Sequence, residues 1–485
     1  MLHFKLINKI IGYLLLIEAL LMSWCLIVSF IYREDDIFAF TCSIIITIMA
    51  ALGLITLGRN AKNTLSQRDA YLIVTATWII FSLFGTLPFL ISGYERNFTN
   101  AYFETMSGFT TTGSTIINNV EALPHGLLFW RSLTQYIGGL GIVFFTVALL
   151  PSLGNGSVRI FAAESTGPFK TKLHPHISTN AKWIWIVYLI LTTGCAISYH
   201  IGGMNIFDAI NFSMTTTATG GFGTHNESFA FYHSKFIEYA CILFTFLSGI
   251  NFTLLYTSLF KGKIKNLFHN SEFKFYLIII LSFSAFIAFM LIYNNHYDLE
   301  HAFRKAAFQV VTFMTTTGFY SDDAATWPHI TWVFLAICMF FGASSGSTSG
   351  GLKCIRGVMT MKVIKKEFLQ ILHPNAVLPV KVGRINIPEQ KGITLLAFLA
   401  TYLILCLVSS SILIAMGIDN TDAITMTLSS MGNVGPALGT EIGPTMSWNI
   451  LPDAAKWLCA FLMLIGRLEI FTVLVIFTPA FWKNN

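Results

Sequence analysis

Apolar runs of about 20 residues recur along the whole chain, with shorter polar segments between them. An α-helix of that length spans the hydrocarbon core of a bilayer. The first run follows Lys5 and Lys9, but it is too long for the core of a signal peptide, so we expect it to remain as a helix. The pattern predicts ten transmembrane spans, at residues 10–32, 37–58, 70–92, 127–150, 183–202, 236–260, 275–293, 330–344, 392–416 and 454–478.

The last eight spans form four pairs, and each pair encloses a polar stretch that ends on glycine. The final glycines are 108, 97 and 117 residues apart, so a unit of roughly a hundred residues repeats four times. Non-helical backbone at membrane depth is tolerated only where protein buries it or where it lines a water-filled path. We call these stretches the four glycine loops: residues 110–113, 218–221, 315–318 and 432–435.

Each repeat is therefore predicted to contain a helix, a pore helix, a filter loop and a second helix around one axis. Aligned alanines (Ala101, Ala209, Ala306 and Ala423) each precede the final glycine by 12 residues. In repeat two Gly220 competes with Gly221, and the match of Phe222 with Phe319 favours Gly221. Glycine allows backbone angles that turn carbonyls toward an ion. The predicted donors are Thr111, Thr112 and Gly113; Thr219, Gly220 and Gly221; Thr316, Thr317 and Gly318; and Asn433, Val434 and Gly435.

Composition and charge agree with a membrane protein and give it an orientation. Hydrophobic residues make up 54% and charged residues 11%, far fewer than the roughly 25% of a soluble domain. The face with both termini and loops 59–69, 151–182, 261–274 and 352–391 carries 22 Lys/Arg and 5 Asp/Glu. The opposite face carries 7 and 17. The positive-inside rule places both termini in the cytoplasm, and the acidic outer face would concentrate cations.

A run of small residues interrupts the second helix of repeat three. It is polar and too flexible for a lipid-facing helix, and no Gly-Lys-Ser/Thr follows it as in a phosphate-binding loop. We interpret it as a gate that crosses the path under the filter; a simple glycine-rich kink is the alternative. We call it the serine–glycine loop: Gly342, Ala343, Ser344, Ser345, Gly346, Ser347, Thr348, Ser349, Gly350 and Gly351.

Arg467 is the second candidate gate residue. It lies about 13 residues into the last span, hence ~20 Å below its outer end. A charge at that depth should face protein or water, where it would oppose a passing cation. Hydroxyls or carbonyls of the serine–glycine loop are expected partners, whereas Glu469 points to another helix face. The alternative is a structural salt bridge.

Two motifs carry a resemblance to a known family: Trp130-Arg131-Ser132-Leu133-Thr134-Gln135-Tyr136-Ile137-Gly138-Gly139-Leu140-Gly141 and Gly346-Ser347-Thr348-Ser349-Gly350-Gly351-Leu352-Lys353. The chain resembles the Trk/Ktr/HKT superfamily of potassium transporters, most closely the bacterial TrkH type. The resemblance implies a four-repeat pore within a homodimer in the bacterial inner membrane, and a cytosolic nucleotide-binding ring (TrkA) as partner. It implies potassium selectivity because all four filter glycines are present; Asn-Val in the fourth loop departs from the pattern.

The fold expected is an all-α polytopic membrane protein with an N-terminal helix pair and four repeats. The predicted units are residues 1–66, 67–165, 166–268, 269–380 and 381–485. The expected function is potassium uptake through a gated, channel-like pore, with K⁺ in the filter, no covalent cofactor, no nucleic acid partner and lipid as surroundings. A proton- or sodium-coupled symporter is the alternative, although only Glu18 and Glu469 place carboxylates within spans. A membrane enzyme is disfavoured, because His174 and His176 alone suggest a metal site only weakly.

Overall fold

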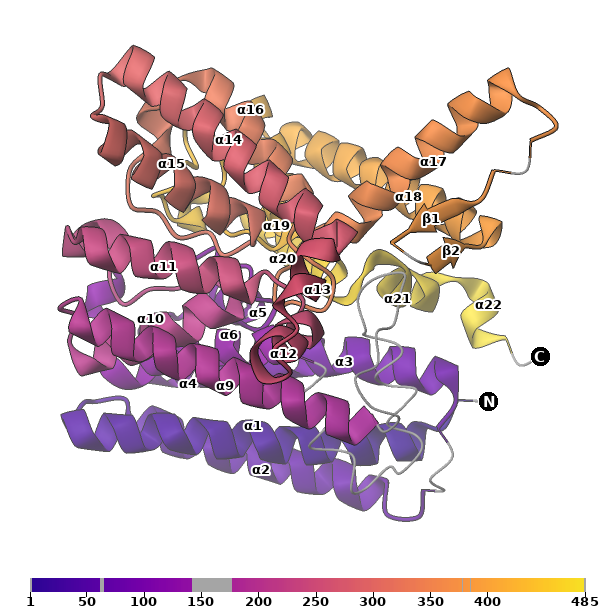
Figure 1. Ribbon diagram of the computed structural model, residues 1–485. Helices are drawn as coiled ribbons and strands as arrows, with labels where there is room; N and C mark the ends of the chain where they lie inside the picture. The colour runs from indigo at the N-terminus through magenta and orange to yellow at the C-terminus, as the bar shows by residue number, and fades with distance from the viewer. Residues whose placement is uncertain (1, 62–64, 142–176, 377, 384, 484–485) are drawn as a thin grey trace.

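The computed structural model describes residues 2–61, 65–141, 177–376, 378–383 and 385–483. Long helices cross the molecule side by side, with α1 and α2 along one edge and α14 to α18 along the other (Figure 1). Six of the described helices are long and apolar enough to span a membrane, or eight if each of two bent helix pairs counts as one span. The chain is thus an all-α polytopic membrane protein, as its hydropathy predicts.

The N-terminal pair is a close antiparallel hairpin of α1 (Phe4–Tyr32) and α2 (Ile37–Leu57). A Cβ on Gly12 would lie 2.8 Å from the Ala51 carbonyl oxygen, so the absence of a side chain lets the two backbones approach. The turn between the helices also holds the next repeat, because Glu34 accepts hydrogen bonds from the backbone nitrogen and the ring of His125.

The remaining helices follow the predicted order, with one short buried helix in each repeat. The first two groups are α3 (Gln67–Gly85), α4 (Leu87–Ser92), α5 (Phe98–Phe109) and α6 (His125–Leu140), then α9 (Ile177–Ile201), α10 (Ile206–Ala218), α11 (Lys235–Ser248) and α12 (Phe252–Phe260). The last two are α13 (Ile264–His269), α14 (Ser271–Asn295), α15 (Leu299–Met314), α16 (His329–Phe340) and α17 (Cys354–Leu372), then α18 (Glu389–Ala415), α19 (Asn420–Gly432), α20 (Asp453–Leu468), α21 (Ile470–Leu474) and α22 (Pro479–Trp482).

The short buried helices α5, α10, α15 and α19 each begin at an Asn or Asp. Asn97, Asn205 and Asp419 accept a hydrogen bond from a backbone nitrogen of the first turn, as N-cap residues do. Asp298 occupies the same position without such a bond. Short 3-10 helices follow at Val120–Ala122, Ser228–Tyr232, Ala324–Thr326, Trp448–Ile450 and Val475–Phe477.

Two of the predicted spans are bent pairs of helices rather than single helices. Residues 236–260 form α11 and α12, which meet at 105°, because Asn251 starts a new helix by accepting a hydrogen bond from the Leu254 nitrogen. Residues 454–478 bend by 114° after α20, where Glu469 takes a φ of 65°. Hydropathy cannot register either break, since both sides of each are apolar.

Other expected boundaries also move. The helix expected at 330–344 ends at Phe340, where the serine–glycine loop follows. The span expected at 127–150 ends as α6 at Leu140, and its last residues lie outside the described part. A small antiparallel hairpin that the sequence did not predict pairs β1 (Val380–Val382) with β2 (Ile385–Ile387). The boundaries between the four repeat units stay predictions.

Candidate functional site: a ring of four glycine loops

The four glycine loops share one unusual backbone conformation. The residue two before the final glycine is left-handed in each: φ is 54° at Thr111, 55° at Thr219, 58° at Thr316 and 54° at Asn433. The final glycines have φ values of 87°, 87°, 79° and 103° at Gly113, Gly221, Gly318 and Gly435. Non-glycine residues held in this region are strained and gather at functional sites. The same strained conformation at the equivalent residue of all four loops therefore indicates that the loops form one repeated functional element.

The loops are in contact with one another in chain order and close into a ring. A Cβ added to any of the final glycines would lie 2.6 Å or less from a carbonyl oxygen of the next loop. Gly113 faces Gly220, Gly221 faces Thr317, Gly318 faces Val434, and Gly435 faces Thr112. The last contact returns to the first repeat. No residue with a side chain fits these four positions, because carbonyl groups of the neighbouring loop already occupy the space.

Several buried oxygens at the ring have no hydrogen-bond partner within the described part of the chain. Thr111 Oγ1 and Asn433 Oδ1 occupy the same place in repeats one and four. The hydroxyls of Ser107, Ser429 and Ser430, on the helices that lead into these loops, are also unpaired. Buried polar atoms are normally paired, so a cluster of unpaired acceptors calls for an explanation. A dehydrated cation is the species that such oxygens accommodate.

Helix α6 braces the second loop. Gln135 Nε2 donates to the Gly220 carbonyl at 2.7 Å, and its Oε1 accepts from the Phe222 nitrogen at 3.0 Å. Trp130 Nε1, one and a half turns earlier, donates to the Gly85 carbonyl at 3.1 Å. One lone pair of the Gly220 carbonyl is thus engaged by protein. The 130–141 motif fixes the position of the loop, a role that its sequence did not disclose.

Arg131 ties the first two repeats together beside the ring. Its Nε lies 2.8 Å from Glu104 Oε1, both side chains are buried, and its Nη1 donates to the Gly223 carbonyl at 3.0 Å. The guanidinium also lies 4.2 Å from the centre of the Phe222 ring. Glu104 accepts a further bond from the Ile116 nitrogen at 3.0 Å. The ion pair therefore holds the strands that leave the first two loops.

A polar residue directly precedes the aligned alanine in every repeat. In three of the four repeats this residue is hydrogen-bonded to the outgoing strand, by which we mean the extended segment that follows the glycine loop. Asp208 accepts from Thr224 Oγ1 at 2.6 Å, Lys305 Nζ donates to the Ser321 carbonyl at 2.7 Å, and Asp422 accepts from the Glu441 nitrogen at 3.2 Å. The fourth member, Asn100, instead accepts from a buried lysine of α20. The alignment of the repeats contained this signal, because all four positions are polar.

Tyr232 also donates to Asp208, at 2.8 Å, from the short 3-10 helix beyond the second loop. Burial, together with the negative charge of Asp208, raises the pKa of the Tyr232 hydroxyl well above its ordinary value. The hydroxyl therefore stays protonated and remains a donor at any physiological pH. The second outgoing strand is in this way fixed by two independent donors to one carboxylate.

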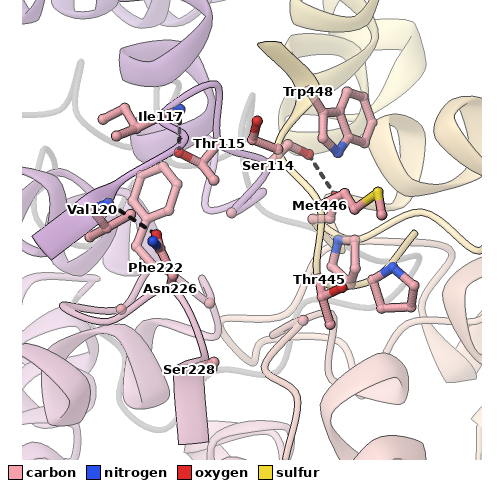
Figure 2. Close-up of a pocket in the computed structure, with 18 of the residues that line it drawn as sticks. Ser114, Thr115, Ile117, Val120, Phe222, Asn226, Ser228, Thr445, Met446 and Trp448 are labelled. Carbon is pink, nitrogen blue, oxygen red and sulfur yellow. Dashed lines mark hydrogen bonds between the residues drawn. The ribbon is translucent and has the colours of Figure 1, made fainter. Parts of the chain in front are cut away.

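A cavity of about 390 Å³ lies where the chain leaves the glycine loops. All four final glycines line it, together with polar residues of the outgoing strands (Figure 2). Ser114 Oγ closes one side by donating to the Gly435 carbonyl at 2.8 Å, and Trp448 packs beside it. The cavity is a vestibule that ends at the ring.

The serine–glycine loop lies on the opposite side of the ring, at the ends of the short helices. Thr348 Oγ1 donates to the Thr217 carbonyl at 3.0 Å, and the Gly350 nitrogen donates to Thr316 Oγ1 at 2.7 Å. Gly350 also packs against the carbonyl of Gly432, so closely that a Cβ would not fit. The loop thus contacts repeats two, three and four where their short helices end.

Arg467 links the serine–glycine loop to the first repeat as well. Its Nη1 donates to the Thr348 carbonyl at 2.8 Å and its Nη2 to the Gly139 carbonyl at 3.0 Å. The expected contact with a carbonyl of the serine–glycine loop is therefore present. Glu469 pairs with Arg356 at 2.6 Å. Lys353, which is buried, donates from Nζ to the Ser349 carbonyl of the loop, a contact that the sequence gave no reason to expect.

In the described ranges, no group of three or more His, Cys, Asp and Glu side chains is arranged to hold a metal ion. The pair His174 and His176 lies outside the described residues. The ring is lined instead by backbone carbonyls and hydroxyls, and oxygens of this kind suit a weakly hydrated monovalent cation better than a transition metal.

Fold and site together define a helical membrane protein whose four repeated loops meet in a ring between a vestibule and a covering loop. Residues 36–484 match the TrkH family, described as a cation transport protein. The chain belongs to this family.

Individual relatives match over essentially the full length. The chain is 35% identical to the Trk system potassium uptake protein TrkH of Halomonas elongata, with 99% of each chain covered. It is 36% identical to TrkH of Escherichia coli K12, covering 99% of this chain and 100% of the relative. The crystal structure of the potassium transporter TrkH from Vibrio parahaemolyticus superposes with a TM-score of 0.90 at 33% identity, over 99% of this chain and 100% of that one.

Proposed function

We propose that this protein mediates potassium uptake, by passing K⁺ through the ring of glycine loops. The closure of the ring carries the proposal: each final glycine adopts a positive φ and lies against a carbonyl of the next loop. The names of relatives that cover the whole chain support K⁺ as the cargo, since they are potassium uptake proteins.

The ring supplies the chemistry that a dehydrated ion requires. Carbonyl oxygens replace water around the ion, and their number and spacing determine which cation is accommodated. The unpaired Thr111 Oγ1 and Asn433 Oδ1 add two acceptors on the side facing the serine–glycine loop. The ligands are drawn from the predicted set: Thr111, Thr112, Gly113, Thr219, Gly220, Gly221, Thr316, Thr317, Gly318, Asn433, Val434 and Gly435.

The serine–glycine loop and Arg467 form the gate in this proposal. The loop lies across the ends of the short helices, and the guanidinium is fixed to one of its carbonyls. A cation that leaves the ring toward this side meets a half-buried positive charge, whose repulsion is strong while water is excluded. Opening would move the loop aside and let water screen the arginine.

The setting of the pore follows from charge and from the family. The basic face carries both termini and lies in the cytoplasm of a bacterial cell with the protein in the inner membrane. A homodimer and a cytosolic nucleotide-binding ring of the TrkA type complete the system. The basic segments 261–274 and 352–391 would form the surface on which this cytosolic partner docks. Segment 151–182 would join them, although most of it lies outside the described residues.

A channel-like mechanism is favoured over coupled symport. Coupling to protons needs a titratable group along the path of the ion. Glu18 is buried in α1 and lies beside Gly85, on the outer side of the first short helix rather than at the ring. Glu469 is engaged by Arg356. We therefore assign neither carboxylate to the path.

Ion flux into proteoliposomes tests the proposal. Purified protein is reconstituted with K⁺ inside, and uptake of radioactive rubidium is followed with K⁺ or Na⁺ as competitor. We expect K⁺ to suppress uptake far more strongly than Na⁺, and a membrane potential alone to drive it. Uptake no greater than in protein-free vesicles, or uptake that requires a proton gradient, contradicts the proposal.

A further inference from the structure

One buried carboxylate is hydrogen-bonded both to the first half of the serine–glycine loop and to the helix that follows it. Glu272, in the first turn of α14, accepts from the Ser345 nitrogen at 2.6 Å and from its hydroxyl at 3.1 Å. The same carboxylate accepts from the Ile355 nitrogen at 3.2 Å, just after the loop. Hydrogen bonds to a charged acceptor are the strong ones. Glu272 therefore joins the start of the loop to the helix α17 that follows it.

A second anchor lies at the bend between α11 and α12. Asn251 Nδ2 donates to the Ser345 carbonyl, and the Phe252 nitrogen donates to the Gly346 carbonyl at 3.0 Å. Asn251 is also the residue that starts α12, since its Oδ1 accepts from Leu254. The bend between α11 and α12 thus turns the first residues of α12 toward the loop.

The two anchors belong to one short stretch of chain. Residues 251–252 begin α12 and Glu272 begins α14, and between them the backbone runs through α13. The middle of this stretch is exposed and basic, with Lys261, Lys263 and Lys265 all at the surface. A displacement of the middle reaches Asn251 along α12 and Glu272 through α13 and the turn at Asn270.

We infer that residues 251–272 form a clamp that holds the serine–glycine loop closed, with Glu272 as its positioning residue and the basic middle as the point where an acidic partner surface acts. The inference rests on the proposed function and specifies its regulation. Withdrawal of the clamp leaves the Ser345 and Ile355 nitrogens without acceptors. The loop then keeps its contacts at Thr348 to Gly350 beside the ring and the bond from the Ser344 nitrogen to the Gly249 carbonyl.

Hydrogen–deuterium exchange of the full-length protein in detergent tests the clamp without relying on ion flux. In Glu272→Ala we expect the amides of Ser345 and Ile355 to exchange on the order of tenfold faster. The matched control is Asn270→Ala, which removes the N-cap of α14 but touches no residue of the loop. We expect wild-type exchange in the loop for this control.

Flux gives the second readout. Glu272→Ala should raise basal rubidium uptake several-fold in the absence of a partner and leave the K⁺ over Na⁺ preference unchanged. Reversing the charges of Lys261, Lys263 and Lys265 should abolish the increase in uptake that the acidic partner produces in the wild type. Adding Glu272→Ala to that variant should raise uptake without the partner. A wild-type protein that fails to conduct K⁺ would refute the proposed function, while the exchange experiment would still decide the clamp.

Three results overturn the inference. The first is loop exchange in Glu272→Ala equal to the wild-type value. The second is an equal increase in Asn270→Ala, which would show that any loosening of α14 suffices. If the alanine variant does not fold, Glu272→Leu replaces it, because leucine keeps much of the side-chain volume and has no acceptor for the Ser345 and Ile355 nitrogens; wild-type loop exchange in that variant also overturns the inference.

Discussion

Replacing Gly113 by serine should weaken the preference for K⁺ over Na⁺. Gly113 has a φ of 87°, and a Cβ there would lie well inside 3.0 Å of the Gly220 carbonyl oxygen. That oxygen belongs to the ring and is also held by Gln135. The new side chain must therefore displace a proposed ligand of the ion or move its own loop.

The size of the effect follows from two contributions. A residue with a Cβ in the left-handed region costs about 1–2 kcal/mol. Relief of the overlap requires a shift of roughly 1 Å to reach an ordinary contact distance. If about half of that strain falls on the geometry of the ion site, the discrimination between the two cations drops by about 0.5–1 kcal/mol, hence roughly two- to fivefold.

Gly417 provides the matched control. It has a φ of 92°, close to that of Gly113, but nothing lies within 4 Å of its Cβ position. Gly417→Ser therefore introduces the same backbone strain away from the ring. Competition by K⁺ and Na⁺ against rubidium uptake measures both variants in proteoliposomes. The reasoning is refuted if Gly113→Ser inserts normally and keeps wild-type selectivity, above all if Gly318→Ser does so too.

Two further predictions concern the gate and the cytosolic face. Arg467→Ala should raise basal uptake several-fold with unchanged ion preference, because it removes a half-buried positive charge that opposes a passing cation. Unaltered basal uptake in a folded variant would make the arginine structural. Charge reversal of Lys261, Lys263 and Lys265 should abolish co-purification of the proposed cytosolic partner. Undiminished co-purification would show that docking does not use these charges.

The ring could be predicted from the sequence because its requirements are local and repeated. Glycine at a fixed offset from an alanine, four times, reports a backbone conformation that few other residues adopt. The choice of Gly221 over Gly220 came from the same alignment, and Gly221 is the one with the positive φ. The contact of Arg467 with the serine–glycine loop was also expected, since a charge at that depth needs a polar partner.

The supporting contacts were out of reach for a different reason. Gln135, Glu272 and Lys353 act through partners 85, 73 and 4 residues away in the chain. Only the tertiary fold brings the first two pairs together, and no periodicity encodes them. The two helix breaks were missed because hydropathy averages over a window and is blind to a capping Asn251 or to the backbone of Glu469.

Anomalous diffraction from crystals of this protein grown in rubidium or thallium salt tests the central claim most directly. The account predicts a peak on the axis of the ring, within coordination distance of the carbonyls of Thr112, Gly220, Thr317 and Val434, which weakens when Na⁺ replaces the heavier ion. Peaks confined to the vestibule or the protein surface, with none between the four glycine loops, would contradict it.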